Sequence, residues 1–368
     1  MDGLSPLSRC DPGILSLFAS RIKLHSLMEL KEGPCTIPEL ALHAPFSVSS
    51  FAAPVRDLIR DQIVCREGRL LRLTGCGEIL AGSVKDFIDA CGSPGCAARG
   101  ERSAMAQRII RSPPAVNLLC SLQAGIPQKK GGSTSPAPLH RGIYLLHDAG
   151  LIVACNGSVA LSDEGKSVVM SLENLLAAAN LLVRHREFWM YHTIDNLPEE
   201  YCRSLGCLHD ADIVGESSTC AFRTFEHFTR IISRAESIMG VSAWMSPGIA
   251  AALAGRVRDG VPVDIVVTAD LLRELSSPSY AHLIDPLHDC SRFRLYVTHL
   301  PVGIGLIVTP FCLSCGFFSR DTRRYDCMRD LVSRSERAIR WGRDLFTHYR
   351  TTAVPVDPSV MVPVATPI

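Results

Sequence analysis

Residues 36–73, TIPELALHAPFSVSSFAAPVRDLIRDQIVCREGRLLRL, are the stretch from which the fold of the N-terminal part is predicted. Thr36 and Glu39 have the spacing of a capping box, which opens a short helix. A serine-rich turn and an amphipathic helix follow, and the arginine-rich segment 64–73 has the pattern of a β-hairpin. With an apolar-periodic helix over residues 21–31, this order is typical of a winged helix-turn-helix domain, whose third helix enters the major groove of DNA.

The third helix and the hairpin carry the candidate DNA contacts of this first copy. The helix is expected to follow Ser47 or Ser49 and to run to about Asp61, but Pro54 lies inside it and should kink it. Three arginines beside one hairpin suit contacts to phosphates. The predicted DNA-binding residues of this copy are Ser49, Ser50, Arg56, Arg66, Arg69 and Arg72.

The same order of landmarks recurs further along the chain, which indicates an internal duplication. Gly33 matches Gly125 at an offset of 92 residues, and Gly77 matches Gly165 at an offset of 88. In the second copy the sequence predicts helices over residues 114–123 and 135–149, a hairpin that turns at Asn156 and Gly157, and a long helix from about Ser162 to Arg186.

The second copy is less regular than the first. The polar segment 128–134, with two lysines and two glycines, stands where a second helix is needed. Its candidate DNA contacts are Lys129, Lys130, His140 and Arg141. The apolar stripe of the long helix either pairs two subunits into a homodimer or packs on its own domain, and the sequence leaves both open.

The composition limits the class of protein. Of the 368 residues, 47% are hydrophobic and 20% charged, which is enough apolar side chain for several packed domains. The 38 basic and 37 acidic residues exclude a polyelectrolyte, so any contact with nucleic acid depends on local patches. No secretory signal is recognised, and the 15 cysteines are interpreted as reduced thiols, which predicts a cytoplasmic protein.

From residue 192 onward, segments with helical and strand patterns alternate, which predicts an α/β sensor-like domain. Between Arg294 and Arg320 there are 25 residues in which His299 is the one possible charge at neutral pH, a length that could span a membrane. Proline and glycine interrupt this segment and its apolar residues are largely β-branched or aromatic, so three buried strands are predicted instead.

The predicted fold class is therefore mixed, α+β and α/β, with tandem winged helix-turn-helix domains followed by an α/β sensor domain. A segment rich in Gly, Ser, Pro and Ala separates the two copies. The predicted boundaries are 13–90 for the first winged domain, 91–103 for the linker, 104–190 for the second winged domain with its long helix, 191–350 for the effector-sensing domain and 351–368 for a disordered tail.

Several stretches of the chain resemble one family. They include RHREFW at 184–189, AESIMGV at 235–241, VDIVVT at 263–268 and AIRWGRDLF at 338–346. In this order they resemble archaeal winged-helix transcriptional regulators that carry the methanogenesis regulatory protein middle domain, over about residues 108–349. The resemblance implies a DNA-binding regulator of a methanogenic archaeon, without catalysis, whose middle domain receives a signal.

An effector pocket is expected beyond the C-terminal ends of the strands, if the sheet is open. The predicted effector-binding residues, each of which follows a strand, are Ser242, Trp244, Thr268 and His299. Trp244 can stack on a ligand, and filling the core is its alternative role.

Catalytic, cofactor and metal sites are not predicted. Gly165, Lys166 and Ser167 end like a phosphate-binding loop, but Ala160 stands where that loop needs glycine. Cys312 and Cys315 lie in an apolar strand, where positions three apart face opposite sides and cannot easily share a metal. No H-E-x-x-H or nucleophile-elbow pattern is present.

The sequence thus predicts a cytoplasmic, homodimeric regulator that binds double-stranded DNA and is controlled by a small-molecule or protein signal. The alternative is a signalling adaptor whose degenerate winged helices bind proteins, as Pro54 and the missing helix suggest. A hydrolase with a phospholipase-like sheet is the third hypothesis. The last lysine is Lys166, so a site that needs lysine cannot form in the second half, which disfavours this third hypothesis.

Overall fold

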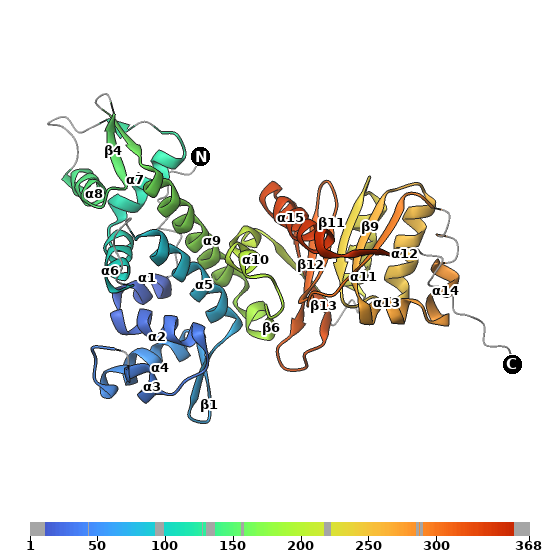
Figure 1. The fold of residues 1–368 in the computed structure, drawn as a ribbon, viewed down its shortest axis with the longest axis horizontal. Coiled ribbons are helices and arrows are strands. Elements are labelled where there is room, and N and C mark those ends of the chain that lie inside the picture. Colours follow the sequence, from blue (N-terminus) through green and yellow to red (C-terminus); the bar gives the residue numbers. More distant parts are fainter. Residues whose placement is uncertain are drawn as a thin grey trace. The chain divides into compact units, whose positions relative to one another are not determined.

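The computed structural model describes residues 12–42, 44–92, 99–126, 128–129, 137–155, 158–216, 222–284, 287 and 290–356. The chain divides into two compact units, Met1–Met190 with Arg203–His209, and Tyr191–Cys202 with Asp210–Ile368. They are called unit 1 and unit 2 below, and each is described by itself (Figure 1).

The first half of unit 1 is helical, with one hairpin. Its elements are α1 (Pro12–Ala19), α2 (Arg21–Glu32), α3 (Ile37–Leu42), the 3₁₀ helix η2 (Val48–Phe51), α4 (Ala52–Arg60), β1 (Val64–Glu67), β2 (Leu70–Leu73) and α5 (Gly75–Ala90). Leu27, Phe51, Leu71 and Phe87 are fully buried, so α2, η2, β2 and α5 share one core. An isolated bridge between Cys35 and Leu71 joins the segment before α3 to the hairpin.

The capping box predicted at the start of α3 is confirmed. The Thr36 N–H donates to Glu39 Oε2 at 2.6 Å, and the Glu39 N–H donates to Thr36 Oγ1 at 3.4 Å. These two bonds satisfy backbone donors that have no partner inside the helix. The helix therefore begins where the sequence places it.

The expected kink at Pro54 is wrong. The α-helix begins at Ala52, after the 3₁₀ turn of η2, so Pro54 lies in the first helical turn. Backbone N–H groups of a first turn have no intrahelical acceptor, and a proline there removes no hydrogen bond. Changing from a 3₁₀ turn to an α-helix thus accommodates Pro54.

The second half of unit 1 has a similar order with a smaller helical part. Its elements are α6 (Arg99–Ile110), α7 (Pro113–Gln123), β3 (Gln128–Lys129), α8 (Ala137–Asp148), β4 (Ile152–Cys155), β5 (Ser158–Leu161) and α9 (Asp163–Tyr191). The strands form a three-stranded sheet in the order β3-β5-β4. The turn predicted at Asn156 and Gly157, the start of the helix predicted over residues 135–149 and most of segment 128–134 lie outside the described residues.

The duplication is visible in the local geometry after each hairpin. Thr74 Oγ1 accepts the N–H of Gly77 at 3.1 Å, and Ser162 Oγ accepts the N–H of Gly165 at 2.9 Å. Each hydroxyl therefore opens the helix that follows its hairpin, α5 in the first copy and α9 in the second. The predicted offset of 88 residues is confirmed for this pair of helix starts.

Both glycines of this pair allow the backbone to approach closely. A Cβ atom at Gly77 would lie 2.1 Å from the carbonyl oxygen of Ile63, and one at Gly165 would lie 1.9 Å from that of Leu151. Any side chain at either position would displace the helix from the hairpin. The phosphate-loop appearance of Gly165 is thus explained by packing.

Helix α9 packs its apolar stripe inside a single chain. The buried stripe residues are Val168, Val169, Leu172, Leu175, Leu176 and Leu182. Packing on its own domain is therefore the interpretation that the structure supports, and these side chains are not a free dimer surface. The helix is long and apolar enough to cross a membrane, yet 56% of its most apolar window is buried, as in a core helix.

Unit 2 is built on one mixed sheet. Its strands are β6 (His192–Thr193), β7 (Asp212–Gly215), β8 (Ile238–Ser242), β9 (Val263–Thr268), β10 (Phe293–Thr298), β11 (Ile304–Val308), β12 (Leu313–Ser319), β13 (Tyr325–Ser333) and β14 (Val354–Val356). The order is β14-β10-β9-β8-β11-β12-β13-β7, with β6 beside β12. Strands β8, β9 and β10 run parallel, and the other pairs are antiparallel.

Helices cover the sheet of unit 2. They are α11 (Arg223–Ser233), α12 (Pro247–Arg258), α13 (Ala269–Leu275), α14 (Pro278–Ile284) and α15 (Glu336–Thr352). Two short helices precede them in the chain, α10 (Glu199–Arg203) and the 3₁₀ helix η3 (Leu205–Leu208), and η3 belongs to unit 1. Alternate residues of β9, such as Ile265, pack with α11, α12 and α13 in one core. Helix α15 packs through Gly342 against Val308 and Leu313.

The three strands predicted between Arg294 and Arg320 are confirmed as β10, β11 and β12. The predicted tail is wrong at its start, because Val354–Val356 pairs with β10 as an antiparallel edge strand. Valines with β propensity follow the last helix directly and complete the sheet there. The rest of the tail, from residue 357, lies outside the described residues.

Two helical glycines give a matched test of the packing of α15. A Cβ atom at Gly342 would lie 2.4 Å from Leu313 Cδ1 and 2.8 Å from Val308 Cγ2, both buried, whereas nothing lies within 4 Å of a Cβ at Gly255 in α12. We expect Gly342→Ala to lower the free energy of unfolding by about 1–3 kcal/mol. Gly255→Ala should raise it by about 0.4–1 kcal/mol. Denaturant titration of both variants is the measurement, and equal effects would contradict the packing of α15 on the sheet.

Candidate functional site

Two parts of the chain are candidate sites, and the first is the surface of α4 and the hairpin in unit 1. Ser49, Ser50 and Arg56 are all exposed. The hydroxyls of Ser49 and Ser50 lie 3.0 and 2.8 Å from that of Ser47, which orders the turn before α4. Arg60, also exposed, is paired with Asp57 and Asp61. Arg56 is therefore the exposed cation of α4 that makes no ion pair within the described residues.

The hairpin presents its arginines on two faces. Gly68 has φ of 63° in the turn, a conformation that glycine adopts at little cost. Arg66 is paired across the strands with Leu71, whereas Arg72 lies beside Glu67 on the other face and its Nε is 3.1 Å from Glu67 Oε2. Because side chains alternate along a strand, the three predicted arginines do not form one cluster. Arg66 and Arg69 are exposed and make no ion pair in the described part of the chain.

The second copy offers fewer described cations. Arg141 is exposed on α8 and His140 is half-buried beside it. Tyr144, one turn further along α8, is 66% exposed. The backbone of Lys129 lies in β3, but its side chain and all of Lys130 lie outside what the structure describes.

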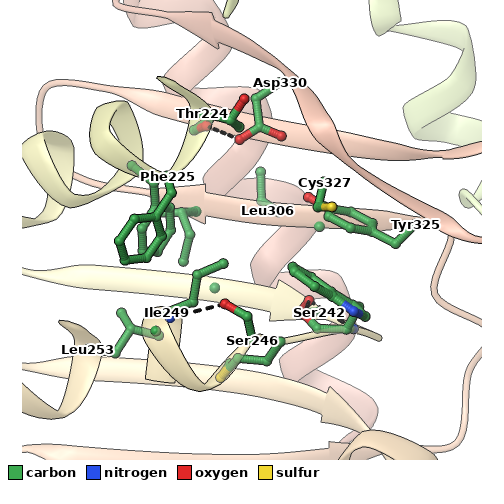
Figure 2. A pocket seen from close by; sticks show the side chains of 18 of the residues that line it. Thr224, Phe225, Ser242, Ser246, Ile249, Leu253, Leu306, Tyr325, Cys327 and Asp330 are labelled. Carbon is green, nitrogen blue, oxygen red and sulfur yellow. Dashed lines mark hydrogen bonds between the residues drawn. The ribbon is translucent and has the colours of Figure 1, made fainter. Parts of the chain in front are cut away.

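The second candidate site is a pocket of about 450 Å³ in unit 2. Figure 2 shows it between α11 and α12 on one side and the sheet on the other. Its aromatic lining is Phe222, Phe225, Phe228, Trp244 and Tyr325, and its aliphatic lining includes Met245, Ile249, Leu253, Ile265, Leu306, Ile307 and Met328. The polar lining residues are Glu216, Thr224, Ser242, Ser246, Ser314, Cys327 and Asp330. A largely apolar cavity with few polar groups is the usual form of a small-molecule site.

Two paired glycines lie under Tyr325, a residue that lines this pocket. Gly305 of β11 is paired with Gly316 of β12, and Gly316 is paired in turn with Asp330 of β13. A Cβ at Gly316 would lie 2.2 Å from the Tyr325 hydroxyl and 2.6 Å from Asp330 Oδ1. The Tyr325 hydroxyl therefore rests on bare backbone beside the carboxyl of Asp330.

Asp330 is the unusual titratable group of the pocket. Burial raises its pKa to about 7, against the effect of a hydrogen bond from Ser314 Oγ, at 3.3 Å from Asp330 Oδ2. The nearby carboxylate of Asp326 raises this pKa further, and His192 lowers it. Burial and the charge of Asp330 also raise the pKa of the Tyr325 hydroxyl well above its ordinary value. A carboxyl of this kind changes its charge near neutral pH.

Trp244 and Tyr325 form a stacked aromatic pair at the pocket. Their ring centroids are 5.3 Å apart and their planes differ by 16°. The Ser242 hydroxyl accepts the Trp244 N–H at 3.1 Å and donates to the Trp244 carbonyl oxygen, which fixes the turn after β8. Ser242 thus positions the backbone of Trp244, whose side chain lines the pocket.

The pocket brings together two of the four effector-binding residues predicted from the sequence. Ser242 and Trp244 line it, whereas Thr268 does not and instead accepts the Leu271 N–H at 3.3 Å as the N-cap of α13. His299 is exposed beyond the end of β10 and does not line this pocket either. The cavity lies over the face of the antiparallel strands β11–β13, and the rule that places sites at strand ends applies to open parallel sheets.

The pocket side chains that come from β13 were not predicted from the sequence. Tyr325, Cys327 and Asp330 come from this strand, which was not predicted because charged residues interrupt its apolar pattern. A signal was nevertheless present, since glycines inside predicted strands, here Gly305 and Gly316, often mark close approach of another group. Across the described residues no cluster of three or more His, Cys, Asp or Glu side chains is arranged to hold a metal ion.

Comparisons with known proteins give two matches to one family. The model "Methanogenesis regulatory protein FilR1, N-terminal domain" matches residues 13–91, and "Methanogenesis regulatory protein FilR1, middle domain" matches residues 221–352. Methanogenesis regulatory protein FilR1 of Methanothrix harundinacea (strain 6Ac) is 24% identical over 200 residues, which are 54% of this chain and 45% of that protein. The match therefore spans less than half the length of this relative.

A solved structure also shows a weak similarity. It is described as "Structure of TrmBL2, an archaeal chromatin protein, shows a novel mode of DNA binding", with 13% identity and a TM-score of 0.31 over 67% of this chain and 94% of that chain. A TM-score this low supports no conclusion about the present chain.

The raised pKa of Asp330 predicts a pH-dependent stability. The folded chain keeps the proton up to about pH 7, whereas an ordinary aspartate loses it near 3.8. Between these values the folded state binds more protons, so stability falls as pH rises. We expect Asp330→Asn, which cannot ionise, to melt several degrees above the unchanged protein at about pH 8. The gap should close as the pH approaches about 4. Thermal unfolding across this range is the measurement, and a gap independent of pH would contradict the assignment.

Proposed function

The chain belongs to the FilR1 family of methanogenesis regulatory proteins, and from this we propose that it is a DNA-binding transcriptional regulator controlled by a small-molecule signal. In this proposal unit 1 binds double-stranded DNA and the pocket of unit 2 receives the signal. The proposal assigns no catalytic role to the chain.

The observation that carries the DNA-binding role is the arrangement of α3, α4 and the hairpin in the first copy. Helix α3 and helix α4 follow one another, the hairpin comes next, and the bridge from Cys35 to Leu71 ties it to the helices. We interpret this order as a winged helix-turn-helix. In such a domain the third helix lies in the major groove and the hairpin follows the phosphate backbone.

The exposed cations support the same assignment. Arg56 projects from α4, the helix that would enter the groove, and Arg66 and Arg69 project from the hairpin. Ser49 and Ser50 precede α4, near its N-terminus, where backbone N–H groups favour phosphate oxygens. Arg72 contributes less, because its guanidinium already pairs with Glu67.

We propose that the first copy is the one that reads DNA. In the first copy, helices α3 and α4 are both formed before the hairpin. In the second copy, strand β3 lies within the segment where the second helix is expected. The cationic residues of the second copy would then contact phosphates and not bases; they are Arg141, His140, Lys129 and Lys130. A homodimer fits two-fold DNA sites, but its interface would have to lie outside the buried stripe of α9.

The DNA-binding role is tested by selecting genomic fragments on the purified protein at two salt concentrations. Enriched fragments should bind with an affinity that falls steeply as salt rises, because phosphate contacts release counterions. Arg56→Gln and Arg69→Gln should each weaken binding and reduce the slope of log affinity against log salt by about 1. Arg141→Gln should have a smaller effect.

Arg343→Gln is the matched control, since Arg343 is exposed on α15 of unit 2. It removes the same charge and should leave the slope unchanged. Loss of binding in Arg141→Gln alone would move the reading role to the second copy. Failure to enrich any fragment, together with a stable protein partner, would replace the proposal by the adaptor hypothesis.

A further inference from the structure

The pocket of unit 2 has an uneven charge. Among the described residues, its lining includes two carboxyl groups, Glu216 and Asp330, and no lysine, arginine or histidine. Glu216 is already occupied, because its carboxylate oxygens accept the N–H groups of Arg223 and Thr224 at 3.3 and 3.4 Å. It caps the start of α11. Asp330 is therefore the carboxyl available to a ligand.

Three serine and threonine hydroxyl groups of the lining are hydrogen-bonded to the backbone of the protein itself. Thr224 Oγ1 donates to the Met328 carbonyl oxygen at 3.0 Å, and Ser246 Oγ accepts the Ile249 N–H at 3.3 Å. Ser242 is bonded to the backbone of Trp244. Within the part of the chain that the structure describes, the Asp330 carboxyl accepts one hydrogen bond, from Ser314 Oγ at 3.3 Å. A half-buried carboxylate with one such bond is costly unless a proton or a cation neutralises it.

The walls of the pocket set the rest of the ligand. Phe225, Phe228, Ile249 and Leu253 form an apolar wall from α11 and α12, which suits a hydrocarbon chain or ring (Figure 2). The stacked rings of Trp244 and Tyr325 also line the cavity, and aromatic faces attract cations. The cavity thus combines the carboxyl of Asp330, which does not cap a helix, with aromatic faces and an apolar wall.

We propose that this pocket binds a protonated organic amine, with its N–H donating to Asp330 and its apolar part against α11 and α12. The inference rests on the proposed signal-receiving role of unit 2 and adds the class of the signal. An anionic ligand would meet two carboxyl groups and no cation in this lining. A neutral alcohol would gain the apolar contacts without the ion pair.

The proposal predicts an order of affinity among three probes with the same hydrocarbon chain: hexylamine, hexanol and hexanoate. Titrations of the full chain at about pH 8, followed by ligand-detected NMR, should show hexylamine bound roughly tenfold or more tightly than hexanol, and hexanoate weakest. At about pH 6 the advantage of hexylamine should shrink, because Asp330 must then release a proton to pair with the amine.

Asp330→Asn identifies the carboxyl responsible. This variant should bind hexylamine roughly ten- to hundredfold more weakly while its affinity for hexanol stays within about twofold. Trp244→Leu should weaken hexylamine more than hexanol, because the aromatic face is lost. Asp344→Asn is the control, since Asp344 is exposed on α15 and outside this lining. It should change neither affinity.

Other charged groups near Asp330 have to be separated in the pH experiment. His192 and Asp326, whose Nε2 and Oδ2 atoms are 3.0 Å apart, influence Asp330, and Tyr325, Cys327 and Glu216 border the same space. The pH dependence that remains in Asp330→Asn measures their contribution and should be small. Thermal unfolding of each variant confirms that it is folded.

The results distinguish the ligand class from the function. Tighter binding of hexanoate or hexanol than hexylamine, with loss in a pocket variant, would overturn the amine class and keep unit 2 as a small-molecule receptor. Equal binding of hexylamine by Asp330→Asn and the unchanged protein, or no binding of any probe, would also overturn the inference. The DNA-binding proposal stands or falls separately, on the arginine variants of unit 1.

Discussion

Gly305 and Gly316 impose the constraint on which the pocket of unit 2 depends. They face each other across β11 and β12, and a Cβ atom at either would lie within 2.5 Å of the Tyr325 hydroxyl. Side chains normally fill the space above a sheet, so the missing volume lets the phenol ring lie over the strands. From that position Tyr325 stacks on Trp244 and borders Asp330. The stacked aromatic pair thus depends on the absence of side chains at these two glycines, and the half-buried carboxyl of Asp330 lies beside it.

Much of the fold could be predicted because the decisive patterns are local. The capping box at Thr36 and Glu39 and the three strands between Arg294 and Arg320 depend on short-range periodicity, and the structure has them where the sequence places them. The effect of Pro54 was predicted wrongly because it depends on where the helix begins. The helix begins at Ala52, so Pro54 lies in the first turn, where proline is tolerated. Strand β14 was missed because three residues gain strand structure only by pairing with β10.

The candidate site was predicted less well than the fold, for a physical reason. Ser242 and Trp244 follow a recognisable strand, so a rule about strand ends could find them. Asp330 has no local signal, because the pocket that it borders is formed with residues of α11, α12 and β8, which are distant in sequence. The charged residues Asp326 and Arg329, which precede Asp330 in β13, make this strand look polar in the sequence, although the Asp330 carboxyl borders the cavity. Hydrophobic periodicity assigns charged residues such as aspartate to the surface, so it does not find a charged residue that lines a pocket.

The two copies in unit 1 show which positions a duplicated domain is free to change. Where a helix meets its hairpin, Gly77 and Gly165 have almost the same approach to a carbonyl oxygen, and Thr74 and Ser162 make the same cap. The surfaces differ, since arginines project from the first hairpin and Ser158 to Leu161 in the second carry no charge. Backbone geometry tolerates no side chain at those two glycines, whereas an exposed hairpin can exchange charge at little cost to stability. The two copies thus share one backbone geometry after the hairpin, and the exposed arginines of the first hairpin are one reason why we propose that the first copy reads DNA.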